Sequence, residues 1–293
     1  MTQVSKPASL FLPMAAAVGA MATFQIGAAF SKWLFPLVGP QGAAALRLAL
    51  ASVILLAVVR PWRVWPKDAP VRAMLLLGAS MAGAVLMFFL ALDRLPLGVI
   101  IALQFLGPLA IALFGSRKFH DLVWAALAAA GVWLLVGAGP AGKDFDMIGL
   151  GFALAGGGFW AAYILLGGKV SAAFGSSTAA VAVTIAAVIV LPVGIIQAGG
   201  AMFAPSVIPL AVLVALFTTV IPFSLEFYAL PRMPARTFSV FTSLEPAFAV
   251  LSGLILLGEH LAWSQITGVA LVIAAAAGAT WSTTATPPVA PTN

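Results

Sequence analysis

The chain has 293 residues, of which 63% are apolar and only 8% are charged, and its formal net charge is +6. An ordinary soluble domain carries roughly 25% charged residues, so this chain cannot cover its apolar side chains well enough to stay in water. It contains no cysteine, which excludes disulfides, thiolate metal sites and a cysteine nucleophile.

Ten apolar segments predict ten membrane-spanning helices, because about 20 apolar residues in a helix cross a hydrocarbon core of about 30 Å. The predicted spans are 11–35, 40–59, 71–92, 96–115, 121–139, 147–169, 177–198, 206–229, 235–257 and 261–281. The connections are short, so no separate soluble domain is expected. The first apolar run continues to about Phe35, too long for the roughly 7–15 apolar residues of a cleaved signal.

Lysine and arginine are divided unequally between the two faces of this arrangement. One face has the N-terminus and Lys6, Arg60, Arg63, Lys67, Arg72, Arg117, Lys118, Lys169, Arg232 and Arg236. The other has Lys32, Arg94 and Lys143. Cytoplasmic loops carry the excess of positive charge, so both termini are predicted to be cytoplasmic in a bacterial inner membrane. Topology and contact with lipid therefore explain the charge, and no nucleic-acid partner is expected.

A repeated phrase predicts two related halves. Residues 88–98 read FFLALDRLPLG and residues 226–236 read EFYALPRMPAR, which agree at five of eleven places at a shift of 138. The same shift pairs Pro108 with Pro246, and a nearby shift brings Lys32 close to Lys169. The shift covers five helices, an odd number, so the second half enters the membrane inverted. Inverted repeats are typical of secondary transporters, whose substrate site lies near the midplane between the repeats.

The predicted fold is an all-α integral membrane protein with ten transmembrane helices in two inverted five-helix repeats around a central cavity. The expected units are a cytoplasmic N-terminal segment, two repeats and a disordered tail, at residues 1–10, 11–139, 147–281 and 282–293.

Prolines interrupt the two halves at matching places. Pro108 lies in LQFLGPLAIALF and Pro246 in TSLEPAFAVL. A proline inside a helix removes one backbone hydrogen bond, and the freed carbonyl must find a partner or line a wet cavity. Matched interruptions point to a substrate site. The alternative is that both kinks only shape the packing.

Glu245 is the most informative polar residue, because an ionised carboxylate near the middle of a membrane helix is costly unless it is paired or hydrated. It would contact a substrate ammonium or carry a coupling proton. Alternatively, it would be the structural partner of Arg47 in the second span, or bond the backbone freed by Pro246. The sequence leaves these interpretations open.

Other polar residues extend the candidate site. Glu226, followed by Arg232 and Arg236, predicts a gate or boundary ion pair near the cytoplasmic face. Gln25 and Gln104 suit hydrogen bonding to an uncharged or zwitterionic solute, or bonding between helices.

Trp160 and Tyr163 are three residues apart and so share a helix face, where they would line a pocket or face lipid or a neighbouring helix. The preceding small residues, 155–158, predict a close helix approach. No lysine or serine follows them at the spacing of a phosphate loop.

The sequence offers few residues that could form an enzyme active site. The two histidines, His120 and His260, fall near loops, and no nucleophile, base and orienting acid occur as a set. We therefore predict that the protein is not an enzyme and has no metal site or cofactor.

Five stretches resemble the drug/metabolite transporter superfamily, and within it the ten-helix EamA-type exporters. They are ALRLAL at 45–50, LPLG at 95–98, ALQFLGPLAIALF at 102–114, SRK at 116–118 and RMPARTFSVFTSLEPAFAVLSGLILLGE at 232–259. The pattern is most similar to the threonine/homoserine and YddG-like amino-acid exporters, over about residues 10–282.

The resemblance implies export of amino acids and related metabolites, with helices 1–4 and 6–9 around the cavity. Arg47, Gln104, Glu226 and Glu245 fall on polar places of the family pattern. Gln104 departs from it, because related exporters have glutamate there, so the coupling mechanism does not transfer directly.

The sequence therefore predicts an exporter of neutral amino acids that works by alternating access. A multidrug or lipophilic-cation exporter is the alternative within the superfamily. A non-transporting membrane enzyme or scaffold is the alternative of another class. The oligomeric state stays open.

Overall fold

The computed structural model describes residues 11–63, 65–66, 69–114, 119–137, 146–229, 232–233 and 235–284. Every regular element in these ranges is a helix, and the predicted all-α membrane fold is confirmed. The predicted N-terminal segment and most of the predicted tail lie outside the described residues, as do Lys6, Lys67, Arg117, Lys118 and Lys143.

The first half follows the predicted spans closely. In chain order it consists of α1 (Phe11–Val59), η1 (Pro61–Arg63), α2 (Val71–Leu92), α3 (Leu97–Gln104), α4 (Leu106–Phe114) and α5 (Phe119–Gly137). Gly39 interrupts α1 with a φ of 66°, so α1 contains the first two spans as a hairpin. The fourth span is divided into α3 and α4.

The second half repeats this plan. It consists of α6 (Met147–Phe174), α7 (Ser177–Ala198), η2 (Gly199–Phe203), α8 (Ile208–Ala215), η3 (Leu216–Val220), α9 (Ile221–Ala229), α10 (Ala235–Thr242), α11 (Glu245–Leu257) and α12 (Trp263–Thr284). The eighth span is α8, the π-helical η3 and α9, and the ninth is divided into α10 and α11.

Helix breaks fall at corresponding places in the two halves. A turn at Phe105 separates α3 from α4, and a turn at Ser243 and Leu244 separates α10 from α11. The shift of 138 carries residue 105 to residue 243. Pro108 and Pro246 then lie in the first turn of α4 and α11, where the missing N–H breaks no helical hydrogen bond. Each proline therefore follows a break in its span, whereas the sequence analysis had placed it inside a continuous helix.

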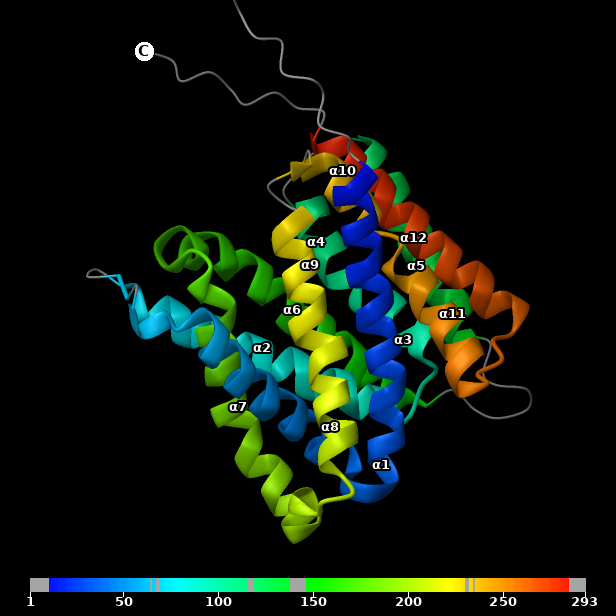
Figure 1. Ribbon diagram of the computed structural model, residues 1–293. Coiled ribbons are helices and arrows are strands. Elements are labelled where there is room, and N and C mark those ends of the chain that lie inside the picture. Colours follow the sequence, from blue (N-terminus) through cyan, green and yellow to red (C-terminus); the bar gives the residue numbers. More distant parts are fainter. Residues whose placement is uncertain are drawn as a thin grey trace, which may run out of the picture.

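The helices form one bundle (Figure 1). α1 packs against α7, α8, η3 and α9; α2 packs against α6 and α7; and α5 packs against α12. α1 begins and α12 ends at the same end of the bundle, at the top of Figure 1. We call this the terminal end.

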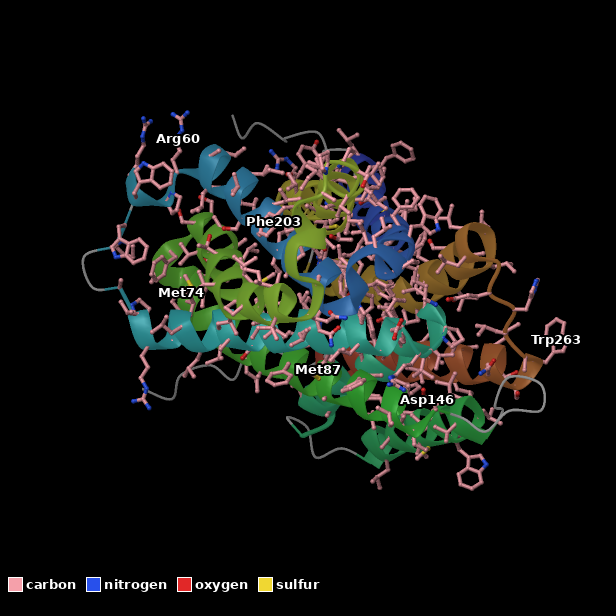
Figure 2. The ribbon with its side chains drawn as sticks, turned by 90° about the horizontal axis from the view of Figure 1, so that it is seen from below. Arg60, Met74, Met87, Asp146, Phe203 and Trp263 are labelled. Atoms are coloured by element: carbon pink, nitrogen blue, oxygen red, sulfur yellow. The ribbon has the colours of Figure 1, made fainter. Side chains whose placement is uncertain are left out.

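Many large apolar side chains remain on the outside, as expected for a protein surrounded by lipid. Ile196 is 86% exposed and Trp263 is 84% exposed. Figure 2 shows Trp263 and Arg60 pointing away from the bundle. Exposed tryptophan at helix ends suits the membrane interface.

Small residues let α4 approach α6, as the run at 155–158 predicts. A Cβ added at Gly107 would collide with the carbonyl oxygen of Gly157, and one added at Gly156 would collide with the side-chain amide of Gln104. The break after α3 therefore lies directly against the glycines of α6.

This contact predicts opposite outcomes for two glycine variants. In Gly107→Ala the new methyl group meets a backbone oxygen that cannot rotate away, and such overpacking costs about 1–3 kcal/mol. Gly158→Ala is the matched control, because a Cβ there meets nothing within 4 Å. Thermal unfolding in detergent micelles should show a lower melting temperature for Gly107→Ala alone. Equal melting of both variants and the parent would contradict the close approach.

Candidate functional site

Glu245 lies at the second helix break, as the first residue of α11. Its Oε1 accepts a hydrogen bond of 3.3 Å from Nε2 of Gln25, which is fully buried in α1. The N-terminus of a helix carries a partial positive charge, which stabilises a nearby carboxylate. The local fold thus holds Glu245 with a helix end and an amide.

Arg47 uses a different set of partners. It is 4% exposed, and its Nη2 donates to the carbonyl of Thr218 at 3.0 Å while its Nε donates to Oγ1 of Thr219 at 3.4 Å. The rings of Phe24 and Phe89 lie 5.3 and 5.7 Å from the guanidinium carbon. Aromatic faces attract a cation, so carbonyl, hydroxyl and rings together hold this buried charge.

One of the roles left open for Glu245 was an ion pair with Arg47, and the structure does not contain this pair. The ion pairs within 4.0 Å in the described part of the chain are Lys32–Glu259 and Arg94–Asp146. The physical reason lies in η3, where a π-helical turn next to α1 offers acceptors to the guanidinium. Single π turns inside α-helices occur frequently at functional sites.

Two buried amide atoms of the predicted site have no hydrogen-bond partner among the described residues. They are Oε1 of Gln25, an acceptor, and Nε2 of Gln104, a donor at the end of α3. An unsatisfied buried polar atom costs about 1–3 kcal/mol. A solute with both a donor and an acceptor would satisfy these atoms.

Trp160 and Tyr163 stack on one face of α6, as their spacing predicts. Their ring centroids are 5.3 Å apart, with an interplanar angle of 15°. Gly156, which touches Gln104, lies on the same face four residues before Trp160.

Six predicted residues lie on elements that pack on one another beside the helix breaks, because α1 contacts α9 and α11, and α3 contacts α6 and α11. We call them the polar cluster: Gln25, Gln104, Trp160, Tyr163, Glu226 and Glu245.

The predicted ion pair between Glu226 and Arg232 is not formed in the described part of the chain. Nη1 of Arg232 instead donates to the carbonyl of Tyr228 at 2.9 Å, and its guanidinium lies 4.2 Å from the Tyr228 ring centroid. The reason is local: carbonyls at the end of a helix lack helical partners, and basic side chains bind them readily. The side chain of Arg236 lies outside the described residues.

Glu259 is a functional candidate that the sequence analysis missed. Its Oε1 lies 2.7 Å from Nζ of Lys32, and its Oε2 accepts a 2.8 Å hydrogen bond from the N–H of Leu97. A signal was present, since Pro96 precedes α3 and offers no side-chain cap, so the first N–H groups of α3 need an acceptor from elsewhere.

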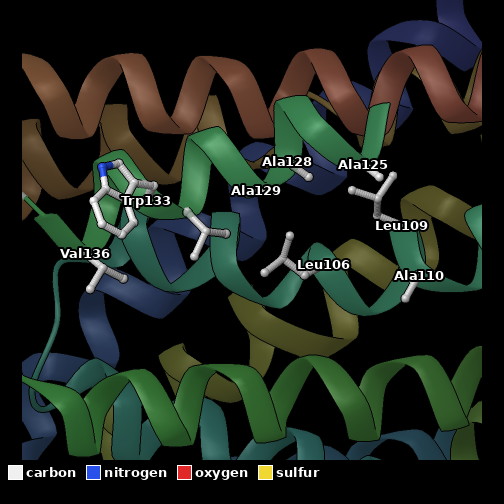
Figure 3. A pocket seen from close by; sticks show the side chains of 9 residues that line it. Leu106, Leu109, Ala110, Ala125, Ala128, Ala129, Trp133 and Val136 are labelled. Atoms are coloured by element: carbon white, nitrogen blue, oxygen red, sulfur yellow. The ribbon is translucent and has the colours of Figure 1, made fainter. Parts of the chain in front are cut away.

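Two cavities among the described residues lie outside the polar cluster. The larger, ≈ 510 Å³, is lined by Leu106, Leu109, Ala110, Ala125, Ala128, Ala129, Val132, Trp133 and Val136 between α4 and α5 (Figure 3). This apolar lining suits hydrocarbon better than a polar solute. The smaller, ≈ 390 Å³, is lined by Lys32, Phe35, Pro36 and Asp93.

Ten apolar spans in two inverted halves, with polar residues beside matched helix breaks, define a helical membrane transporter. The chain belongs to the EamA-like transporter family, which matches residues 147–281. Two relatives are the threonine/homoserine exporters RhtA of Salmonella typhimurium (strain LT2) and Escherichia coli (strain K12). Each is 44% identical over 271 residues, covering 92% of both chains. A solved crystal structure shares the fold with a TM-score of 0.64 at 20% identity, covering 92% of this chain and 98% of the other.

The separate surroundings of Arg47 and Glu245 predict additive effects on stability. Arg47→Gln and Glu245→Gln share no partner, so their losses should add within about 0.5 kcal/mol in the double variant. Thermal unfolding of the parent, both single variants and the double variant measures this. Lys32→Met with Glu259→Gln is the positive control, because that pair is in contact and should show coupling. A stable double variant of Arg47 and Glu245, beside two unstable single ones, would show that the two charges depend on each other.

Proposed function

We propose that the protein exports neutral amino acids, such as threonine and homoserine, from the cytoplasm by alternating access. The observation that carries this proposal is the 44% identity to the threonine/homoserine exporters over 92% of the chain. The polar cluster supports it, because carboxylate and amide groups at the helix breaks match the chemistry of a small zwitterion.

Each end of an amino acid has a partner in this proposal. Glu245 and the free Oε1 of Gln25 accept hydrogen bonds from the substrate ammonium. The free Nε2 of Gln104 donates to the substrate carboxylate. The stacked rings of Trp160 and Tyr163 form the wall beside the substrate side chain.

Arg47 acts through the protein in this proposal rather than on the substrate. Its hydrogen bonds to Thr218 and Thr219 hold the widened turn of η3 against α1. The adjacent Phe24 contributes a ring to Arg47, and Gln25 contributes its amide to Glu245. Movement of α1 at Phe24 and Gln25 would therefore change the surroundings of both Arg47 and Glu245.

The helix breaks are the proposed hinges. α3 and α11 would turn relative to α4 and α10 about the turns at Phe105 and at Ser243 and Leu244, where the regular helix assignment is interrupted. Pro108 and Pro246 keep these turns from closing into continuous helices.

The proposed location is the bacterial inner membrane, with the terminal end of the bundle in the cytoplasm. The distribution of lysine and arginine in the sequence supports this orientation, because positive charges are in excess on cytoplasmic loops.

Counterflow into liposomes that hold only this protein tests the function. Liposomes preloaded with unlabelled threonine should accumulate radiolabelled threonine and homoserine. Methionine, phenylalanine and a lipophilic phosphonium cation serve as competitors. Competition by the cation but by no amino acid would make the protein a cation exporter, and absence of any flux would overturn transport.

Gln25→Leu predicts weaker substrate binding with the fold retained. Leucine fills the volume but removes the amide that contacts Glu245 and the acceptor offered to the substrate. Hydrogen bonds to charged groups contribute about 1.5–3 kcal/mol, so the KM for threonine should rise about 10- to 100-fold.

Gln265→Leu is the matched control for this variant. It removes another buried amide with one unpartnered atom, in α12 and outside the polar cluster. The KM of this variant should equal that of the parent. A similar rise of KM in both would mean that Gln25 acts on stability and not on the substrate.

A further inference from the structure

Glu259 links three elements at the end of the bundle opposite the terminal end. Its carboxylate binds Lys32 of α1 at 2.7 Å and the N–H of Leu97 at the start of α3 at 2.8 Å. Its own N–H donates to the carbonyl of Gly253 in α11 at 3.0 Å, after Gly258 ends that helix in the left-handed region with a φ of 64°. We call the contact of Glu259 with Lys32 and Leu97 the latch.

The latch lies at the outer ends of α3 and α11, which we call the half-helices because each forms one half of a divided span. α3 starts at the latch and ends at Gln104, while α11 starts at Glu245 and ends just before Glu259. At 1.5 Å per residue, these helices place the latch roughly 12–20 Å from the polar cluster, about half of the hydrocarbon core. The latch therefore lies between the polar cluster and one membrane face.

Both half-helices are in direct contact behind the latch. A Cβ added at Gly98 would collide with the side chain of Val250 and approach its backbone N–H at 3.2 Å. Outside the latch lies the ≈ 390 Å³ cavity that Lys32, Phe35, Pro36 and Asp93 line. Lys32 thus faces a hollow on one side and the packed ends of α3 and α11 on the other.

The latch also joins the two repeats, since Lys32 and Leu97 belong to the first and Glu259 to the second. A solute can leave the polar cluster at this end only after the repeats separate here. We propose that Glu259 is the gate residue of the periplasmic face. Its bonds to Lys32 and Leu97 hold the exporter closed to the periplasm and break when the substrate is released. This inference rests on the proposed alternating access and orientation.

The other ion pair in the described part of the chain, between the first repeat and the residue just before α6, is more exposed than the latch. Arg94 and Asp146 are 3.0 Å apart, with side chains 38% and 33% exposed, against 26% and 14% for Lys32 and Glu259. The N–H of Gly149, with the Arg94 guanidinium, holds the pKa of Asp146 below its ordinary value. Exposed pairs of this kind contribute little. Asp146→Asn keeps an oxygen for the helix start and removes only the pair, so it is the matched control.

The first experiment releases the latch. Because the chain has no cysteine, Val99→Cys places a single thiol at a fully buried position two residues inside Leu97. Whole cells are treated with a maleimide that cannot cross the inner membrane, and the labelling rate is measured. Glu259→Gln and Lys32→Met each remove the ion pair but leave an acceptor for the Leu97 N–H. Each should raise the labelling rate by about fivefold or more, as expected for coupled sites.

The matched control, Asp146→Asn, should label at the parental rate. Parental labelling rates for Glu259→Gln and Lys32→Met, in folded protein, would overturn the gate.

The second experiment locks the latch. Lys32→Cys with Glu259→Cys is joined by a short reducible bifunctional thiol reagent, and threonine counterflow is measured before joining, after joining and after reduction. Flux should fall to the background of empty liposomes when joined and return on reduction. Unchanged flux in the cross-linked protein would show that this contact does not open during transport, and would overturn the proposed gate.

Labelling needs no substrate, so it separates the gate from the proposed function. Faster labelling of Glu259→Gln, in a protein without amino-acid flux, would support the gate and overturn the proposed substrate. Amino-acid flux together with parental labelling rates in the latch variants would support the proposed substrate and overturn the gate.

Discussion

Every backbone N–H and C=O inside hydrocarbon needs a partner, and this chain breaks that regularity at two equivalent places. An unbroken helix satisfies the rule by itself, whereas a helix that starts inside a span, as α4 and α11 do, begins with N–H groups that lack partners in its own helix. Gln104 and Glu245 lie directly beside these turns, as the last residue of α3 and the first of α11. The position of the polar cluster follows from that constraint.

Much of the fold could be predicted from the sequence, because lipid requires long apolar helices with short connections. The spans 71–92 and 177–198 match α2 and α7 to the residue. The repeated phrase and its matched prolines located both helix breaks, because proline cannot donate a backbone hydrogen bond wherever it stands. The internal repeat thus indicated where the helices break, without any knowledge of tertiary contacts.

Side-chain partners were harder to predict, because polar pairing in a membrane depends on which helices touch. Arg47 is a buried charge and Glu245 a partly buried one of opposite sign, and pairing was a reasonable expectation. The π turn at η3 and the start of α11 supply each charge with its own acceptors or dipole, and neither feature has a strong sequence signal. Glu259 was missed because it stands beyond the apolar run, where glutamate is ordinary.

The charged side chains within the bundle are stabilised in two distinct ways, and the difference bears on which parts can move. Glu245 and Arg47 are held by helix ends, amides, carbonyls and rings, so each keeps its partners while its own helix pair stays together. Lys32 and Glu259 depend on each other across the boundary between repeats. Separating them requires water to replace the lost contact, and the adjacent ≈ 390 Å³ cavity offers space for that water. A contact that solvent can replace is suited to opening and closing, whereas the enclosed contacts of Arg47 are suited to keeping a shape.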